Sequence, residues 1–286
     1  MRDYVILSDS GTDLTHTLAN EIGVRILDLM VIMEGVAEPK PDSAVDHKEF
    51  YQFLRDKKMA STSAVNPETF YEVMEEYIND GRDVLYLGFS SGLSNTYNAG
   101  RIAAEELSEK YPEAKIYACD TLCASLGQGM LVYLAAKKKA EGATIDELRD
   151  WVETTKLHQC HWFTVDDLMF LKRGGRVSAA TAAVGTLLGI KPVMHVDNAG
   201  KLIKIGTARG RKASLDALFD KTLATITEKD VAFICHGDCV EDANYLAERY
   251  KNELGIKEVI IGYTGVVIGS HSGPGTLAVF YIGTER

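Results

Sequence analysis

Residues 83–98, DVLYLGFSSGLSNTYN, contain the pattern that decides the fold. A run of β-prone apolar residues, 84–87, breaks at Gly88. A turn rich in serine and glycine follows and leads into a segment with the composition of a helix. A strand, a short turn and a helix in this order form the repeating unit of parallel α/β sheets. The stretch therefore predicts an α/β domain.

The segments on both sides of this stretch repeat the alternation. Pro67 begins an expected helix with apolar residues at helical spacing, and Gly81 ends it. Strands are expected at 4–7 and at 115–118, and helices at about 93–111 and 124–141. A second apolar run covers 24–33. The first half of the chain thus predicts a parallel sheet flanked by helices.

The second half has a different pattern. Residues 192–196 and 201–205 flank Asp197-Asn198-Ala199-Gly200, which is typical of an antiparallel hairpin. Helices at about 213–228 and 243–254 alternate with strands at 231–235 and 259–261. We therefore expect two domains, an N-terminal α/β domain (1–160) and a C-terminal α+β domain (161–286) with a largely antiparallel or mixed sheet. A small-molecule site is expected between them.

Composition limits the classes of function. The 286 residues are 46% hydrophobic, enough for a large core. A formal net charge of −10 argues against broad binding to nucleic acid or to an anionic membrane. The N-terminal MRDYVILSDS does not resemble a signal peptide, and no apolar run approaches the length of a membrane span. We expect a cytoplasmic protein with five reduced cysteines and no integral membrane contact.

Two interpretations of the central turn stay open. The letters from Gly88 to Gly92 fit G-x-S-x-G, the nucleophile elbow of an α/β serine esterase. Asp197 with His236, or Asp238 with His271, would supply the other triad members in the right order. An upstream HGG-type oxyanion segment is missing from the sequence. The alternative is an anion-binding loop, in which hydroxyls and backbone N–H groups receive a carboxylate or phosphate.

Other segments favour the anion-binding loop. SDSGT at 8–12 and STS at 61–63 also lie beside expected strands and helices, where such groups converge, although each could simply cap its own helix. The loop HSGPG from His271 can present backbone N–H groups, and the cluster Lys172, Arg173 and Arg176 could meet an acidic ligand. The uncharged, small-residue run 177–190 could line a tunnel or pack against a helix.

Spaced cysteines and histidines raise the question of a metal. Cys119 and Cys123, Cys235 and Cys239, and the pair His158 and His161 are separated by three, three and two residues. The cysteine spacing is one residue wider than the commonest zinc knuckle, and buried cysteine usually only packs. We expect neither a metal nor another cofactor.

Six segments taken in order resemble the DegV family of bacterial fatty-acid-binding proteins. They are SDSGTDLT, STSAVNPETF, GFSSGLSNTYNAG, YACDTLCAS, LKRGGRVS and SHSGPGT, and they cover the chain from Asp9 to Thr276. The resemblance implies a lipid-binding protein that holds a long-chain fatty acid in a buried tunnel. It also implies a partner, the catalytic protein of a fatty acid kinase, which makes acyl phosphate for phospholipid synthesis. The binding protein would not itself be an enzyme.

The resemblance assigns residues as well. The carboxylate-binding threonine and serine of the family fall on Thr62 and Ser94, with His271 and Arg176 beside the carboxylate and at the kinase-facing surface. We expect Thr62 and Ser94 to lie in loops that line a cleft. Ser63, Ser91 and Gly92 are further candidates in the same segments. The chain departs from the family pattern at Asn95, where glycine is usual, and at 64–65, where Ala-Val replaces Gln-Pro.

Overall fold

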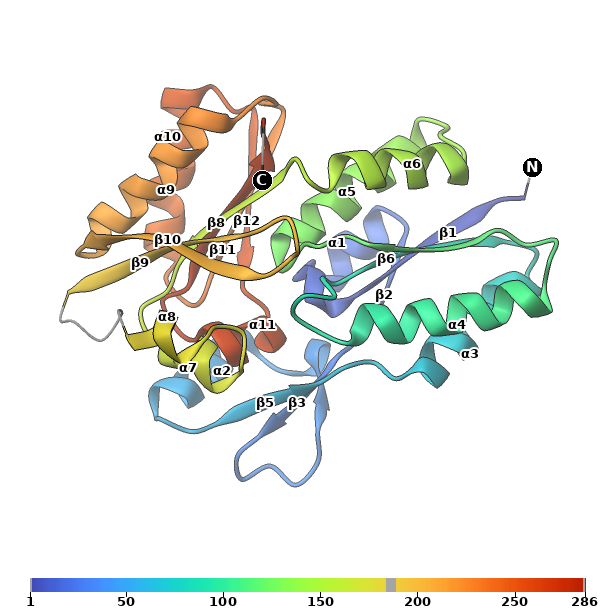
Figure 1. Cartoon of the computed structure of the whole chain (residues 1–286), viewed down its shortest axis with the longest axis horizontal. Helices are drawn as coiled ribbons and strands as arrows, with labels where there is room; N and C mark the ends of the chain where they lie inside the picture. Colours follow the sequence, from blue (N-terminus) through green and yellow to red (C-terminus); the bar gives the residue numbers. More distant parts are fainter. Residues whose placement is uncertain (1, 184–188, 285) are drawn as a thin grey trace.

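The computed structural model describes residues 2–183, 189–284 and 286, and this part of the chain contains three sheets (Figure 1). The first has four strands in the order β2-β1-β6-β7, and the second has six in the order β10-β9-β8-β13-β11-β12. The third is small, with the order β4-β3-β5. Figure 1 shows the four-stranded sheet on the right and the six-stranded sheet on the left.

The four-stranded sheet is entirely parallel, as the alternating pattern predicts. Its strands are β1 (Tyr4–Asp9), β2 (Val24–Leu27), β6 (Asp83–Gly88) and β7 (Ile116–Asp120). Two helices, α3 (Pro67–Asn79) and α4 (Thr96–Lys110), pack on one face. The other face is covered by α1 (His16–Glu21), α5 (Leu126–Ala140) and α6 (Ile145–Thr155).

Local signals in the sequence set the helix boundaries. The Asn66 side chain accepts a hydrogen bond from the Thr69 N–H at the start of α3, and Gly81 follows its end with φ +79°. Helix α4 begins at Thr96 rather than near residue 93, because the segment before it forms a separate turn. In that turn the Leu93 N–H donates to the Ser90 carbonyl.

The apolar run 24–33 forms two strands that belong to different sheets. Strand β2 ends at Leu27, and β3 (Met30–Met33) joins a different sheet. Leu29 lies at the break, where its N–H donates to Ser10 Oγ and its carbonyl accepts from the Asp42 N–H. The small sheet is completed by β4 (Lys40–Pro41) and β5 (Ala60–Ser63). Other short elements of this half are η1 (Ser10–Thr12), η2 (Asp42–Ala44) and α2 (His47–Arg55).

The six-stranded sheet is mixed, as expected for the second half. Its strands are β8 (Gln159–Thr164), β9 (Ile190–Val196), β10 (Leu202–Arg209), β11 (Val231–His236), β12 (Glu258–Tyr263) and β13 (Leu277–Ile282). Strands β11 and β12 pair in parallel and the other pairs are antiparallel, including the predicted β9–β10 hairpin. The helices of this half are α7 (Met169–Arg173), α8 (Ala179–Ala183), α9 (Arg211–Thr225), α10 (Val240–Leu254) and α11 (Val266–Ser272).

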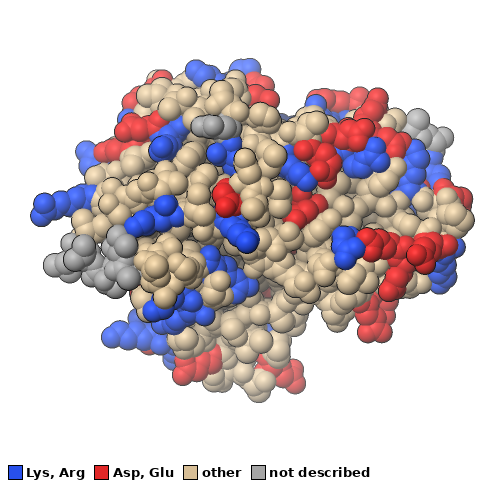
Figure 2. Space-filling model, in the orientation of Figure 1, with Lys and Arg blue, Asp and Glu red and all other residues tan. Residues whose placement is uncertain are grey.

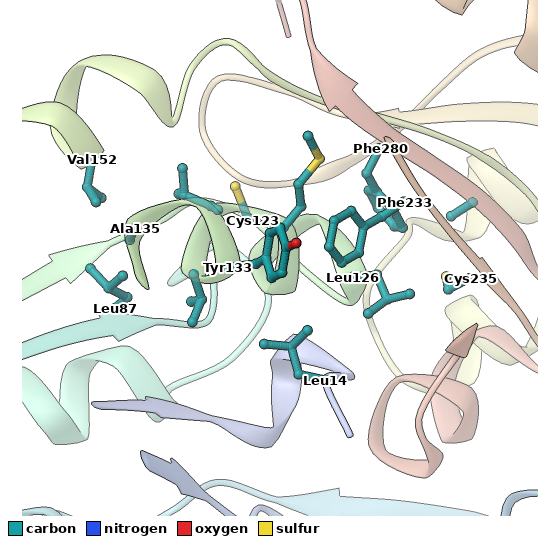
Figure 3. Close-up of a cluster of buried hydrophobic side chains, with 14 of the residues drawn as sticks. Leu14, Leu87, Cys123, Leu126, Tyr133, Ala135, Val152, Phe233, Cys235 and Phe280 are labelled. Carbon is teal, nitrogen blue, oxygen red and sulfur yellow. The ribbon is translucent and has the colours of Figure 1, made fainter. Parts of the chain in front are cut away.

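Helix α5 packs against both large sheets. Tyr133 of α5 meets Phe233 of β11 edge to face, with ring centroids 5.5 Å apart, and Leu126 lies in the same cluster (Figure 3). This cluster also includes Leu87 and Ile6 of the parallel sheet. Because α5 packs against both sheets, the two halves of the chain share one core. The domain boundary expected at residue 160 therefore stays a prediction. All five cysteines are free, as expected. In the described part of the chain, no helix combines the length and the apolarity needed to cross a membrane.

Candidate ligand-binding site

A cavity lies between the parallel sheet's loops, β5, α11 and the six-stranded sheet, and its empty space, including the part open to solvent, is about 730 Å³. Most of the side chains around it are apolar and come from both halves of the chain. They include Leu29, Phe89, Leu93, Phe163, Leu171, Val267 and Phe280. Among its polar lining residues are Thr62, Ser94, Arg176 and His271, which lie far apart in the sequence. The structure thus brings the two main candidates, Thr62 and Ser94, and two of the five secondary candidates, His271 and Arg176, to one cavity.

Thr62 reaches the cavity from strand β5. Its Oγ1 shares a hydrogen bond of 2.8 Å with His271 Nε2 of α11. Our expectation of a loop at this position is wrong, because Thr62 pairs with Val31 in the small sheet. Strand alternation then places Ser61 and Ser63 on the opposite face, where both are exposed. Ser63 is therefore absent from the cavity wall.

Ser94 reaches the cavity from the turn that precedes α4. Its Oγ accepts a hydrogen bond from the Thr96 N–H at 3.2 Å and shares another with Thr96 Oγ1 at 2.9 Å. When the Thr96 hydroxyl donates this second bond, the Ser94 proton is free for a ligand. Asn95, which departs from the family pattern, is exposed at the N-cap of α4 and does not line the cavity.

The two other candidates in this turn have different surroundings. The Ser91 N–H donates to Asp120 Oδ1, and its side chain is exposed. Gly92 packs against the tip of the β9–β10 hairpin, where a Cβ would stand 2.7 Å from the Ala199 carbonyl oxygen. Neither residue lines the cavity. The position of Gly92 instead requires a residue without a side chain, because the hairpin backbone approaches it closely.

Arg176 is a half-buried cation without an acidic partner among the described residues. Its Nε donates to the Leu93 carbonyl at 3.2 Å, and Nη1 donates to the Gly174 carbonyl. Burial lowers the pKa of the guanidinium, and no carboxylate offsets this effect. Neutral carbonyl groups compensate a buried charge only in part. Arg176 is therefore suited to binding an anion that enters the cavity.

His271 is neutral at pH 7. Burial, followed by the nearby Arg176 charge, lowers its pKa from 6.5 to about 4. The imidazole can then donate to or accept from Thr62 Oγ1, depending on its tautomer. With His271 neutral, Arg176 is the cationic residue among those that line this cavity.

The residues of the esterase interpretation are occupied elsewhere. Ser90 is buried, and its Oγ donates to the Gly200 carbonyl at 2.8 Å and accepts from the Gly92 N–H. Asp238 forms an ion pair with Arg55, while His271 bonds Thr62. No hydrogen bond joins Ser90 to a histidine within the described ranges. Ser90 therefore anchors the hairpin to the turn, which is a structural role.

The cysteines and histidines with suggestive spacing also have structural partners. Cys123 Sγ accepts from Arg286 Nη2 at 2.9 Å, and the His158 and His161 rings bond the backbone of Gly283 and Gln159. In the part of the chain that the structure describes, no group of three or more His, Cys, Asp or Glu is arranged to hold a metal.

The cavity wall differs from the sequence prediction in two ways. The described part of the small-residue run, 177–182, contributes no lining side chain, whereas Leu171 and Arg176 just before it do. Residues 184–188 of the predicted wall lie outside the described residues. Conversely, the hydroxyls of Ser125, Thr264, Ser272 and Thr276 line the cavity without having been predicted. Ser125, Ser272 and Thr276 belong to the quoted family segments, whereas Thr264 lies outside them. The spacing of the sequence does not distinguish any of the four as a cavity residue.

A family model described as "Uncharacterised protein, DegV family" matches residues 3–284. A DegV domain-containing protein of Clostridium perfringens is 47% identical, over 100% of this chain and 99% of its own length. The chain belongs to the DegV family. This confirms the resemblance found in the sequence.

Solved structures of the family have the same fold. A fatty-acid-binding DegV protein of Thermus thermophilus aligns with a TM-score of 0.88 and 30% identity, covering 99% of this chain and 100% of its own. A Thermotoga maritima protein with a described fatty acid binding function aligns with a TM-score of 0.83 and 27% identity, covering 98% and 99%. The Streptococcus pneumoniae fatty acid kinase B3 protein, loaded with linoleic acid, has a TM-score of 0.87 and 19% identity, covering 98% and 99%. At that identity the last likeness shows the fold alone.

Proposed function

We propose that this protein binds a long-chain fatty acid in the cavity, with the carboxylate bound by Arg176, Thr62 and Ser94. The observation that carries the proposal is a half-buried cation with no acidic partner among the described residues, in the wall of a largely apolar cavity. A fatty acid combines an anion with an apolar chain and so matches both features. The fatty acid binding described for the Thermus and Thermotoga relatives supports the same ligand class.

The two parts of the ligand would contribute differently. Each methylene group transferred into the apolar cavity stabilises the complex by about 0.8 kcal/mol. The carboxylate must lose its hydration, which the guanidinium and the two hydroxyls offset through charge-assisted hydrogen bonds. The chain therefore supplies most of the affinity, and the polar residues select the acid over other long-chain lipids.

We expect protein produced in bacteria to carry about one long-chain fatty acid per chain. The physical reason is that an apolar cavity is stabilised by a ligand that fills it. Extraction of the purified protein with organic solvent, followed by mass spectrometry, would identify the acid and its stoichiometry. Protein that yields no fatty acid and takes none up from solution would contradict the proposal.

The protein would present its ligand to a separate fatty acid kinase and would not itself be a catalyst. A second hollow, lined by Lys58, Arg173, Gly174 and His271 among others, shares His271 with the cavity. Figure 2 shows Lys and Arg side chains over the α7 region, which includes Lys172 and Arg173, and acidic side chains over α3 and α4. A basic surface beside the carboxylate is suited to a partner that carries phosphate groups.

We expect acyl phosphate to form only when the loaded protein, a fatty acid kinase catalytic protein and ATP are combined. Hydroxylamine trapping of the acyl phosphate would measure the product, and mixtures that lack one component would serve as controls. Acyl phosphate formed by this protein and ATP alone would mean that the protein is itself an enzyme. If only the kinase step fails while fatty acid still binds, the proposal is reduced to lipid binding.

A further inference from the structure

Ser272 has a buried hydroxyl with no hydrogen-bond partner among the residues that the structure describes. It is the last residue of α11, it is among the residues that line the cavity, and only 4% of it is exposed. A buried hydroxyl without a partner is unfavourable for the folded protein. A serine at this position therefore requires an explanation that packing does not supply.

Ser270 of the same helix provides the comparison. Its Oγ donates to the Val266 carbonyl, four residues earlier, at 2.7 Å. This is the usual way in which serine satisfies its hydroxyl inside a helix. Ser272 has no such bond to the carbonyl of Ile268. Its hydroxyl is therefore available to a group outside the helix.

The position of Ser272 indicates which group this is. His271 lines both the cavity and the basic outer hollow, whereas Ser272 lines the cavity and not that hollow. Ser272 thus lies on the inner side of His271, which is bonded to Thr62. A hydrogen bond from this residue would therefore reach a ligand inside the cavity and not a partner at the basic surface.

We propose that the Ser272 hydroxyl is a further hydrogen-bond donor to the carboxylate of the bound fatty acid. The proposal deepens the proposed function and rests on it. A carboxylate accepts about four hydrogen bonds. Because Nε and Nη1 of Arg176 already donate to carbonyl groups, the guanidinium and the two predicted hydroxyls leave room for a further donor. The Ser272 hydroxyl, which has no partner among the described residues, then receives one from the ligand carboxylate.

Two matched variants, Ser272→Ala and Ser270→Ala, test this assignment. Each removes one hydroxyl from the same helix, and each would be delipidated before fatty-acid titration and thermal unfolding. Ser272→Ala is expected to weaken binding of palmitate about tenfold while the unfolding temperature stays the same or rises. Ser270→Ala is expected to lower the unfolding temperature and to leave the affinity unchanged. Ser272→Thr keeps the hydroxyl and should restore most of the binding.

Several results would overturn the assignment. If Ser272→Ala binds palmitate with the wild-type dissociation constant, or is destabilised as much as Ser270→Ala, the Ser272 hydroxyl has a structural role. 3-Hydroxypalmitate carries an additional hydroxyl on its acyl chain. If Ser272→Ala weakens the binding of this ligand alone, the Ser272 hydroxyl contacts the acyl chain and not the carboxylate. These outcomes all require wild-type protein that binds palmitate. Wild-type protein without affinity for any fatty acid would instead contradict the proposed function itself.

Discussion

Replacing Arg176 by methionine is expected to weaken fatty-acid binding by about a hundredfold or more. The guanidinium is half buried and its hydrogen bonds go to carbonyl groups, so the ligand carboxylate would be its ionic partner. Removing one member of a buried charge pair costs about 2 to 5 kcal/mol, because the remaining charge stays desolvated. Since 1.4 kcal/mol corresponds to a tenfold change, the affinity for the acid should fall steeply. Titration with a fluorescent fatty acid would measure it.

Two comparisons separate the charge from the fold. A fatty alcohol of equal length has no charge, so Arg176→Met should change its affinity far less. Arg82→Met removes an exposed arginine that pairs with Asp80, and it should bind fatty acid normally. Equal losses for acid and alcohol in Arg176→Met would mean that the arginine supports the Leu93 turn rather than the anion.

The predictable part of the fold follows from local signals. Pro67, Gly81 and the Asp197-Gly200 turn each impose their geometry within a few residues, and the structure has the helix and the hairpin that they indicate. The break within the apolar run 24–33 could not be predicted, because it depends on distant partners. Ser10 Oγ accepts a hydrogen bond from the Leu29 N–H, and the Asp42 N–H donates to the Leu29 carbonyl. No property of the run itself reveals these contacts.

The site shows the same division between local and distant information. Family motifs placed Thr62, Ser94, Arg176 and His271 among the candidates, and the structure brings them to one cavity. The motifs ranked Thr62 and Ser94 above Ser63 and Ser91, but they left all four as candidates. Which of them line the cavity depends on strand alternation in β5 and on the turn before α4. Ser272 was not identified because only the three-dimensional structure shows that its hydroxyl lacks a partner.

The esterase interpretation illustrates why a short motif is weak evidence. The spacing from Gly88 to Gly92 is correct, yet the role of Ser90 depends on what its hydroxyl contacts. Gly200, more than a hundred residues later, supplies the acceptor. The glycines of the motif have their own reasons: Gly92 lies against the hairpin backbone, and a Cβ at Gly88 would meet Tyr86. Steric fit therefore explains the two glycines that the esterase motif would assign to a catalytic turn.

The second large effect is expected from Thr62 and Ser94. Thr62→Val and Ser94→Ala each remove one hydroxyl, and each should weaken fatty-acid binding about ten- to a hundredfold, because a hydrogen bond to a charged group contributes about 1.5 to 3 kcal/mol. The double variant should lose less than the sum, since both hydroxyls would serve one carboxylate and water can enter once the site is opened. Fluorescent fatty-acid titration of the two single variants and the double variant would give this coupling.

Ser63→Ala is the matched control for this pair, because it lies next to Thr62 on the outward face of the same strand and should leave binding unchanged. Circular dichroism would check that the small sheet is intact in Thr62→Val, where Thr62 pairs with Val31. Strictly additive losses would mean that the two hydroxyls bind different parts of the ligand. Wild-type affinity in both single variants would place the carboxylate elsewhere in the cavity. Arg176 and His271 would then have to bind it without the hydroxyls, and Thr62 would serve only to orient the imidazole.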